Sequence, residues 1–228
     1  MPKPVRSRSP ADRPASRPIS SPIREIHEEI RGAAKPAVAN DAIARFDRAV
    51  QLLERGDAKG AAREAGAAKS LAPRSPAVRE VLGMALYGLG RWHDALKELQ
   101  AYRRMTGRAD QNHLIADCLR GLGRPAEALP LADEELRAKV SNEAKAEALI
   151  VAAGALADQG RFEEALALLR RAHTRERVAE PYTLRLWYAT GDVLSRAGRR
   201  EEAASEFRKI VRHDPAAFDA AERLSQLA

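Results

Sequence analysis

The amino-acid sequence predicts an all-α protein, an α-solenoid of about five helix–turn–helix repeats that ends in a capping helix. Three observations lead to this prediction: a glycine landmark that recurs along the chain, an excess of alanine and a scarcity of aromatic residues. The 228 residues include 46 alanines, and aromatic residues make up only 4%. Alanine is the best helix former, whereas strands favour aromatic and β-branched residues.

Residues 1–21 are predicted to form a disordered basic tail. Residues 1–22 contain six prolines and five serines, and five cations against one carboxylate give this segment +4 of the total net charge of +7. Such a composition buries too little apolar surface to offset the entropy of ordering. Residues 22–40 are predicted to form a short helix and a linker, because Ile23, Ile26 and Ile30 share one helical face.

The repeats are predicted over residues 41–228 from a glycine that is followed, five residues later, by an alanine. A small residue lies seven positions before each glycine and a leucine lies four positions before it, so that each copy supplies a close helix contact and an apolar side chain. A period of this length indicates stacked helix pairs. The turn glycines, spaced 34, 33, 37 and 38 residues apart, are Gly56, Gly90, Gly123, Gly160 and Gly198.

These rows resemble the tetratricopeptide repeat family over about residues 42–217. The resemblance implies a right-handed α-solenoid, and residues 216–228 are expected to form its capping helix. The two longest spacings predict irregular loops near 139–146 and 176–183. More loosely, residues 103–107, 116–118 and 123–125 resemble repeat proteins of high-GC actinobacteria, which implies a bacterial cytosolic protein.

The sequence predicts no enzyme, no cofactor and no metal site. The five histidines lack metal-ligand spacing, and Cys118 is the only cysteine. Gly121 and Gly123 match part of a dinucleotide-binding fingerprint, but that motif follows a strand, and here a helix is predicted. No apolar run is long enough to span a membrane, and no secretory signal is visible, so a cytoplasmic location is expected.

The family resemblance implies a concave groove lined by the positions 13, 10, 6 and 3 residues before each turn glycine. These positions hold five carboxylates and two tyrosines against two arginines, which favours a basic peptide or helix as partner through ion pairs and cation–π contacts. The open alternative is that they are solvated helix positions. The predicted partner-binding residues are Glu80, Met84, Tyr87, Asp110, His113, Asp117, Arg120, Glu147, Tyr188 and Asp192.

The leading functional prediction is therefore a non-enzymatic scaffold or adaptor for protein–protein interaction. The tail could itself occupy the groove of its own or a neighbouring chain. The alternative is an RNA- or ribosome-associated protein that uses the tail and basic clusters on the second helices to neutralise phosphates. Its predicted basic residues are Arg6, Arg8, Arg13, Arg17, Arg103, Arg104, Arg170, Arg171, Arg199 and Arg200.

Overall fold

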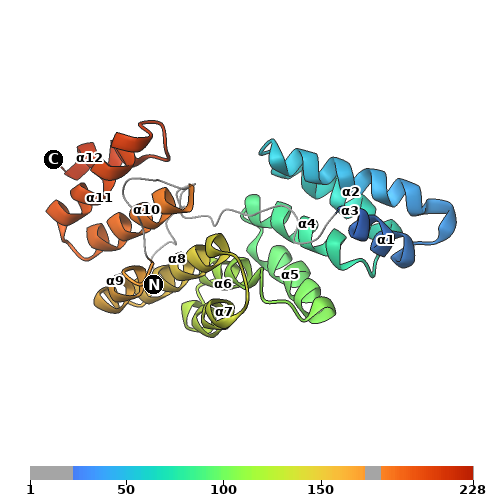
Figure 1. The fold of residues 1–228 in the computed structure, drawn as a ribbon, viewed down its shortest axis with the longest axis horizontal. Coiled ribbons are helices and arrows are strands. Elements are labelled where there is room, and N and C mark those ends of the chain that lie inside the picture. Colours follow the sequence, from blue (N-terminus) through green and yellow to red (C-terminus); the bar gives the residue numbers. More distant parts are fainter. Residues whose placement is uncertain (1–22, 173–180, 228) are drawn as a thin grey trace. The chain divides into compact units, whose positions relative to one another are not determined.

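A computed structural model describes residues 23–172 and 181–227, and all of the regular structure in these ranges is helical (Figure 1). The prediction of an all-α fold is thus confirmed, while the predicted tail, residues 1–21, lies outside the described residues. The helices are α1 (Ile23–Ala33), the 3-10 helix η2 (Pro36–Val38), α2 (Ala39–Glu54), α3 (Ala58–Leu71), α4 (Pro76–Gly88), α5 (Trp92–Thr106), α6 (Asn112–Gly121), α7 (Pro125–Arg137), α8 (Asn142–Asp158), α9 (Phe162–Leu169), α10 (Pro181–Arg196), α11 (Arg200–His213) and α12 (Ala220–Leu227).

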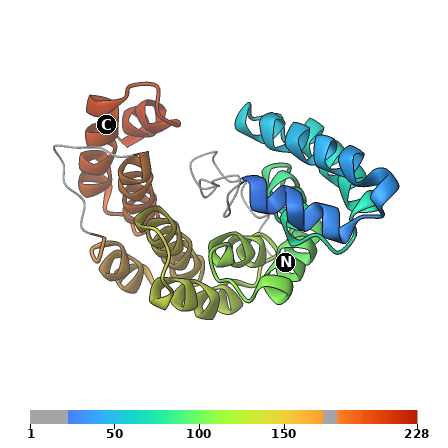
Figure 2. The ribbon, with the colours of Figure 1, turned by 45° about the vertical axis from the view of Figure 1, so that its right-hand side comes forward.

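The helices form five consecutive pairs, each joined at one of the five turn glycines. The pairs are α2–α3, α4–α5, α6–α7, α8–α9 and α10–α11. The chain divides into two compact units whose boundary falls inside α6, between Cys118 and Leu119. We call the described parts of these units the N-unit, residues 23–118, and the C-unit, residues 119–172 and 181–227. Figure 2 shows the pairs of the C-unit stacked in chain order, from olive α7 and α8 to red α12.

The turns use glycine because the backbone there is left-handed. The five turn glycines have φ between 70° and 78°, a region that residues with a Cβ rarely adopt. The amide after each glycine donates to the carbonyl of the leucine four residues before the glycine, at 2.8 to 3.0 Å. This is the Schellman closure of a helix. The leucine row therefore contributes both apolar side chains and the carbonyls that end the first helices.

A repeated ion pair opens the second helices of the last four repeats. The arginine after the turn glycine binds a carboxylate three residues further on, and Asp57 replaces this pair in the first repeat by accepting from the amide of Gly60 at 2.8 Å. The carboxylate at this position also matches the positive end of the helix macrodipole. The four pairs are Arg91–Asp94, Arg124–Glu127, Arg161–Glu164 and Arg199–Glu202.

The small residue seven positions before each turn glycine allows the two helices of a pair to pack closely. A Cβ on Gly83 would lie 2.7 Å from Cγ of Leu99, and one on Gly191 would lie 2.9 Å from Cζ of Phe207. Both facing side chains are fully buried. A small residue thus faces a large one across the α4–α5 and α10–α11 pairs.

The ends of the chain follow the predicted pattern. In α1, Ile26 and Ile30 are buried, and Glu29 accepts from the amide of Ala77 at 3.2 Å, which links α1 to the start of α4. At the other end, Ala220 of α12 is buried in the C-unit core, with Leu224 packed beside it. The predicted capping helix is thus confirmed, and it covers the face of the last repeat.

The prediction of an irregular loop near residues 139–146 is mostly wrong. Ser141 accepts from the amide of Ala144 at 3.1 Å and so caps α8, which begins at Asn142 and runs for 17 residues. The extra residues of this repeat lengthen a helix because an alanine-rich segment with a good N-cap prefers helical structure. For the second expected loop, residues 176–180 lie outside the described residues, and α10 begins at Pro181.

Candidate functional site

Most of the predicted groove residues are buried within their own unit. Seven are at most about one-twentieth exposed, while Asp110, Arg120 and Asp192 are half-buried. Asp110 also departs from its expected place, because it lies in the α5–α6 loop and α6 begins only at Asn112. The seven buried residues are Glu80, Met84, Tyr87, His113, Asp117, Glu147 and Tyr188.

In the N-unit, hydrogen bonds join the predicted residues of one repeat to the next. The hydroxyl of Tyr87 donates to Oδ2 of Asp117 at 2.6 Å, and both side chains are buried. The amide of Gln111 donates to Oε1 of Glu80 at 2.7 Å. Asp110 accepts from the hydroxyl of Tyr102 at 3.0 Å and also pairs with Arg108 at 2.7 Å. The structure thus brings Tyr87 and Asp117 together.

The C-unit holds its repeats together by ion pairs of the same kind. Arg185 of α10 donates from Nε and Nη2 to the two carboxylate oxygens of Glu147 on α8, at 2.7 and 3.2 Å. The Glu147 side chain is fully buried and that of Arg185 is 9% exposed. A buried pair with two parallel hydrogen bonds fixes the orientation of both side chains. This contact sets α8 against α10.

Two ion pairs of Asp158 form a second set of contacts between the repeats of the C-unit. Its carboxylate accepts from Arg120 at 2.9 Å and from Arg196 at 3.0 Å, so that one residue connects three consecutive repeats. Gly154 leaves room for this arrangement, because a Cβ there would collide with the guanidinium of Arg120. Burial alone would raise the pKa of Asp158, but the two arginines outweigh it and hold that pKa below its ordinary value.

The capping helix continues the pattern at the end of the C-unit. Tyr188 donates to Asp219 at 2.6 Å, and Arg223 of α12 donates to Asp192 at 2.8 Å. The rings of Phe207 and Phe218 pack edge-on against Tyr188, with centroids 5.5 and 5.3 Å away. A capping segment therefore supplies the contacts that the first helix of a further repeat would make.

The contacts between repeats share a sequence spacing that was not predicted from the sequence. The partners lie 30, 31 or 38 residues apart, which is close to one repeat length in each case. The signal was present in the sequence, since a polar residue in one copy has a complementary residue one repeat later. The residues missed in this way are Gln111, Asp158, Arg196, Asp219 and Arg223. A role of the ten predicted residues in binding a partner stays a prediction.

The predicted basic residues are divided among separate places. Arg103 and Arg104 lie in the last turn of α5 in the N-unit, whereas the others described lie in the C-unit. Arg199 is neutralised by Glu202 and Glu163, at 2.7 and 3.0 Å, and Arg200 donates to the carbonyl of Gln226. Arg170 and Arg171 follow α9 and are exposed. Arg6, Arg8, Arg13 and Arg17 lie outside the described residues.

The described part of the chain contains no group of three or more histidine, cysteine or acidic residues that could hold a metal ion. Cys118 is buried inside α6. Gly121 and Gly123 lie at the end of α6 and in the turn that follows, not after a strand, and Gly123 serves as a left-handed turn residue. Among the described helices, none is both long and apolar enough to cross a membrane.

Sequence comparison adds the family. A tetratricopeptide repeat model matches residues 80–139, 113–176 and 188–228, which together make up more than half of the chain. The chain belongs to the tetratricopeptide repeat family. A search of curated protein sequences finds no match. Proteins with tetratricopeptide repeats generally act as non-enzymatic scaffolds for protein–protein interaction, which agrees with the leading prediction at this general level.

Solved structures of other proteins show the same fold at low sequence identity. The thermophilic tetratricopeptide repeat protein TTC0263 of Thermus thermophilus has 18% identity and a TM-score of 0.65, with 82% of this chain and 98% of that chain covered. YrrB, described as having an unusual peptide-binding site, has 18% identity and a TM-score of 0.52 over 90% and 98%. A human IFIT1 dimer with m7Gppp-AAAA has 16% identity and a TM-score of 0.61 over 75% and 42%.

Proposed function

We propose that this tetratricopeptide repeat protein is a non-enzymatic scaffold that binds a basic segment of a partner protein along the first helices of its C-unit. The observation that carries the proposal is that carboxylates which take part in contacts between repeats remain partly exposed to solvent. In the C-unit, the side chains of Asp192 and Asp158 are 22% and 27% exposed after pairing. A carboxylate has about four acceptor sites, so each can bind a further donor.

Buried residues of the predicted groove hold the helices that carry these carboxylates in place. In the C-unit, Glu147 and Tyr188 are occupied by contacts between repeats, and such contacts hold α8 and α10, which carry Asp158 and Asp192, in fixed positions. Preorganised groups lose less entropy on binding than mobile ones. The internal arginines Arg196 and Arg223 share these two carboxylates with the partner. A basic segment therefore competes with them, which makes the affinity sensitive to salt.

The experiment is a fluorescence anisotropy titration of the full-length protein with a labelled arginine-rich peptide, the segment 1–22 being the first choice. A peptide of the same composition with glutamate in place of each cation is the control. The double variant Asp158→Asn and Asp192→Asn should weaken binding about tenfold, which corresponds to about 1.4 kcal/mol of binding free energy. The matched variant Asp133→Asn, an exposed carboxylate on the second helix α7, should leave binding unchanged.

The proposal fails if the arginine-rich peptide does not bind at low salt, or if Asp133→Asn weakens it as much as the double variant does. It also fails if the glutamate peptide binds equally well. The alternative prediction, an RNA- or ribosome-associated protein, is tested by the same assay with a labelled RNA oligonucleotide. Its binding would fall steeply with salt and vanish when residues 1–22 are removed.

A further inference from the structure

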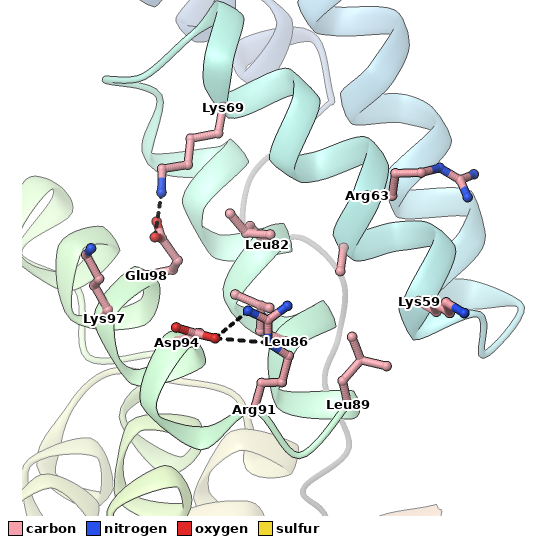
Figure 3. A pocket seen from close by; sticks show the side chains of 11 residues that line it. Lys59, Arg63, Lys69, Leu82, Leu86, Leu89, Arg91, Asp94, Lys97 and Glu98 are labelled. Carbon is pink, nitrogen blue, oxygen red and sulfur yellow. Dashed lines mark hydrogen bonds and ion pairs between the residues drawn. The ribbon is translucent and has the colours of Figure 1, made fainter.

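We propose a second docking surface on the N-unit, for an acidic amphipathic segment of a partner protein. The surface is a groove of about 510 Å³ between α3 and α5, with α4 as its floor (Figure 3). It goes beyond the function proposed above because it lies in the N-unit and takes a partner of the opposite charge. At about 100° per residue, Leu82, Leu86 and Leu89 point away from the side that carries Glu80, Met84 and Tyr87.

The floor of the groove is a stripe of three leucines. Leu82 and Leu86 are 7% and 6% exposed, and Leu89 at the end of α4 is 39% exposed. Their spacing of four and three residues places one leucine on each turn of the helix. A stripe of this kind accepts the apolar face of a partner helix, whose own side chains repeat at the same spacing.

The walls of the groove are basic. Five cationic side chains and two carboxylates line it, which gives a net charge of +3. One of the two carboxylates, Glu98, is buried and accepts from Lys69 at 2.6 Å and from Arg79 at 2.7 Å. The other, Asp94, accepts from Nε of Arg91 at 2.9 Å. The carboxylates of the groove are thus already matched by cations.

Three cations on the two walls are available to a partner. Within the described part of the chain, Lys59 on α3 and Lys97 on α5 make no hydrogen bond or ion pair, and both are exposed. Arg63 on α3 is exposed and touches only its neighbour Glu64, at 3.5 Å. Figure 3 shows Lys97 on one side of the leucines and Lys59 and Arg63 on the other. Aspartate or glutamate on both flanks of an apolar stripe complements this arrangement.

A protein segment fits the groove better than a nucleic acid does. Of the eleven described residues that line it, none is aromatic, and the leucines occupy the floor between the cations. Proteins that bind single-stranded nucleic acids stack bases on aromatic rings inside a basic groove. Here the central surface is aliphatic and offers a base no ring to stack on. The acidic amphipathic helix matches both the charge and the apolar stripe.

The test is a fluorescence anisotropy titration of the full-length protein with a labelled helical peptide that carries leucines on one face and glutamates on both flanks. The variant Leu89→Lys and the triple variant Lys59→Glu, Arg63→Glu, Lys97→Glu should each weaken binding by about tenfold or more. All four side chains are exposed, so the fold is preserved, which circular dichroism checks. A peptide with lysine in place of each glutamate should bind at least about tenfold less tightly.

Two matched controls separate the groove from general effects of charge or apolar surface. The triple variant Arg31→Glu, Lys35→Glu, Arg55→Glu changes the charge of the N-unit equally at exposed sites outside the groove, and Met105→Lys removes another exposed hydrophobic side chain. Both should bind the acidic peptide as the wild type does. Asp192→Asn should also leave this binding unchanged, so that failure here is distinct from failure of the basic-segment proposal.

Absence of peptide binding at low salt overturns the proposal. So does binding that Leu89→Lys and the groove triple variant leave intact, or that the control triple variant weakens equally. A labelled RNA oligonucleotide serves as the competing probe. If RNA binding is lost in the groove triple variant while the peptide does not bind, the groove belongs to a nucleic acid and the proposal is wrong.

Discussion

Replacing Arg185 by leucine removes a buried, doubly hydrogen-bonded contact between two consecutive repeats of the C-unit. The guanidinium holds both carboxylate oxygens of Glu147 at 2.7 and 3.2 Å, and the two side chains are 9% and 0% exposed. Removing one partner of a buried ion pair costs about 3–5 kcal/mol, because the other charge loses its compensation. A domain has a total stability of about 5–15 kcal/mol, so we expect a large downward shift of the unfolding midpoint.

The assay uses the position of the two tryptophans. Trp187 lies in α10 and is 5% exposed, whereas Trp92 lies in α5 of the N-unit. In a Trp92→Phe background, urea unfolding followed by fluorescence therefore reports on the C-unit. The double variant Glu147→Leu, Arg185→Leu should lose less than the sum of the two single losses, because the two residues are coupled. The exposed pair of α7 supplies the control, and Arg137→Gln should cost less than about 0.5 kcal/mol.

A loss below about 1 kcal/mol for Arg185→Leu, the size typical of exposed ion pairs, would refute the reasoning. Additive losses in the double variant would refute it as well. Either result would mean that apolar packing alone sets α8 against α10. The contacts of Tyr87 with Asp117 and of Tyr188 with Asp219 would then lose their interpretation as links between repeats.

Three further predictions use urea unfolding or thermal unfolding of single variants. Gly83→Ala should destabilise the N-unit by about 1–3 kcal/mol, because the new Cβ would lie 2.7 Å from Leu99, whereas Gly66→Ala, with open space around it in α3, should stabilise by about 0.5–1 kcal/mol. Because the pKa of Asp158 is lowered in the folded protein, ionised Asp158 stabilises the fold above its ordinary pKa of 3.8, and this contribution is lost as the pH falls through the pKa of the folded protein. The difference in stability between the wild type and Asp158→Asn should therefore disappear in acid. Burial raises the pKa of Glu29 in the folded protein despite its hydrogen bonds. Protonated Glu29 therefore favours folding below pH 4.5, and this contribution to stability is lost as the pH rises through the pKa of the folded protein. The variant Glu29→Gln, measured across the same pH range, should not show this loss of stability.

Each of these predictions has an outcome that contradicts it. Equal effects of Gly83→Ala and Gly66→Ala would show that helix propensity, not the close contact with Leu99, governs both positions. A gap between wild type and Asp158→Asn that stays constant into acid would mean that the arginine pairs do not stabilise the ionised carboxylate. If the wild type loses no more stability than Glu29→Gln does between low and neutral pH, desolvation of Glu29 does not destabilise the ionised form.

The repeats were predictable because their turns depend on local chemistry. A left-handed residue at the end of a helix favours glycine, and Gly56 or Gly160 can be recognised without knowing any distant contact. The small-residue row was equally readable, since a small residue such as Gly83 recurs seven positions before every turn glycine. Local chemistry also explains the wrong loop prediction, because Ser141 is a usable helix cap that the spacing argument ignored.

The roles of polar side chains were less predictable, because they depend on the following repeat. Asp117 reads in the sequence as an exposed groove position, yet it is buried against Tyr87 of the preceding repeat. The basic groove was missed for a similar reason. Leu86 belongs to the leucine row that the sequence predicts to be apolar packing, and the local sequence does not show that Leu82, Leu86 and Leu89 line a groove between α3 and α5.

The central claim, that this is a protein-binding scaffold, is tested most directly by affinity capture. Tagged full-length protein is recovered from a lysate of its native host, divided into two halves of which one is treated with RNase, and the bound proteins are identified by mass spectrometry. We predict a protein partner at stoichiometric yield in both halves. Recovery of ribosomal or RNA-binding proteins alone, all of which disappear with RNase, would contradict the account.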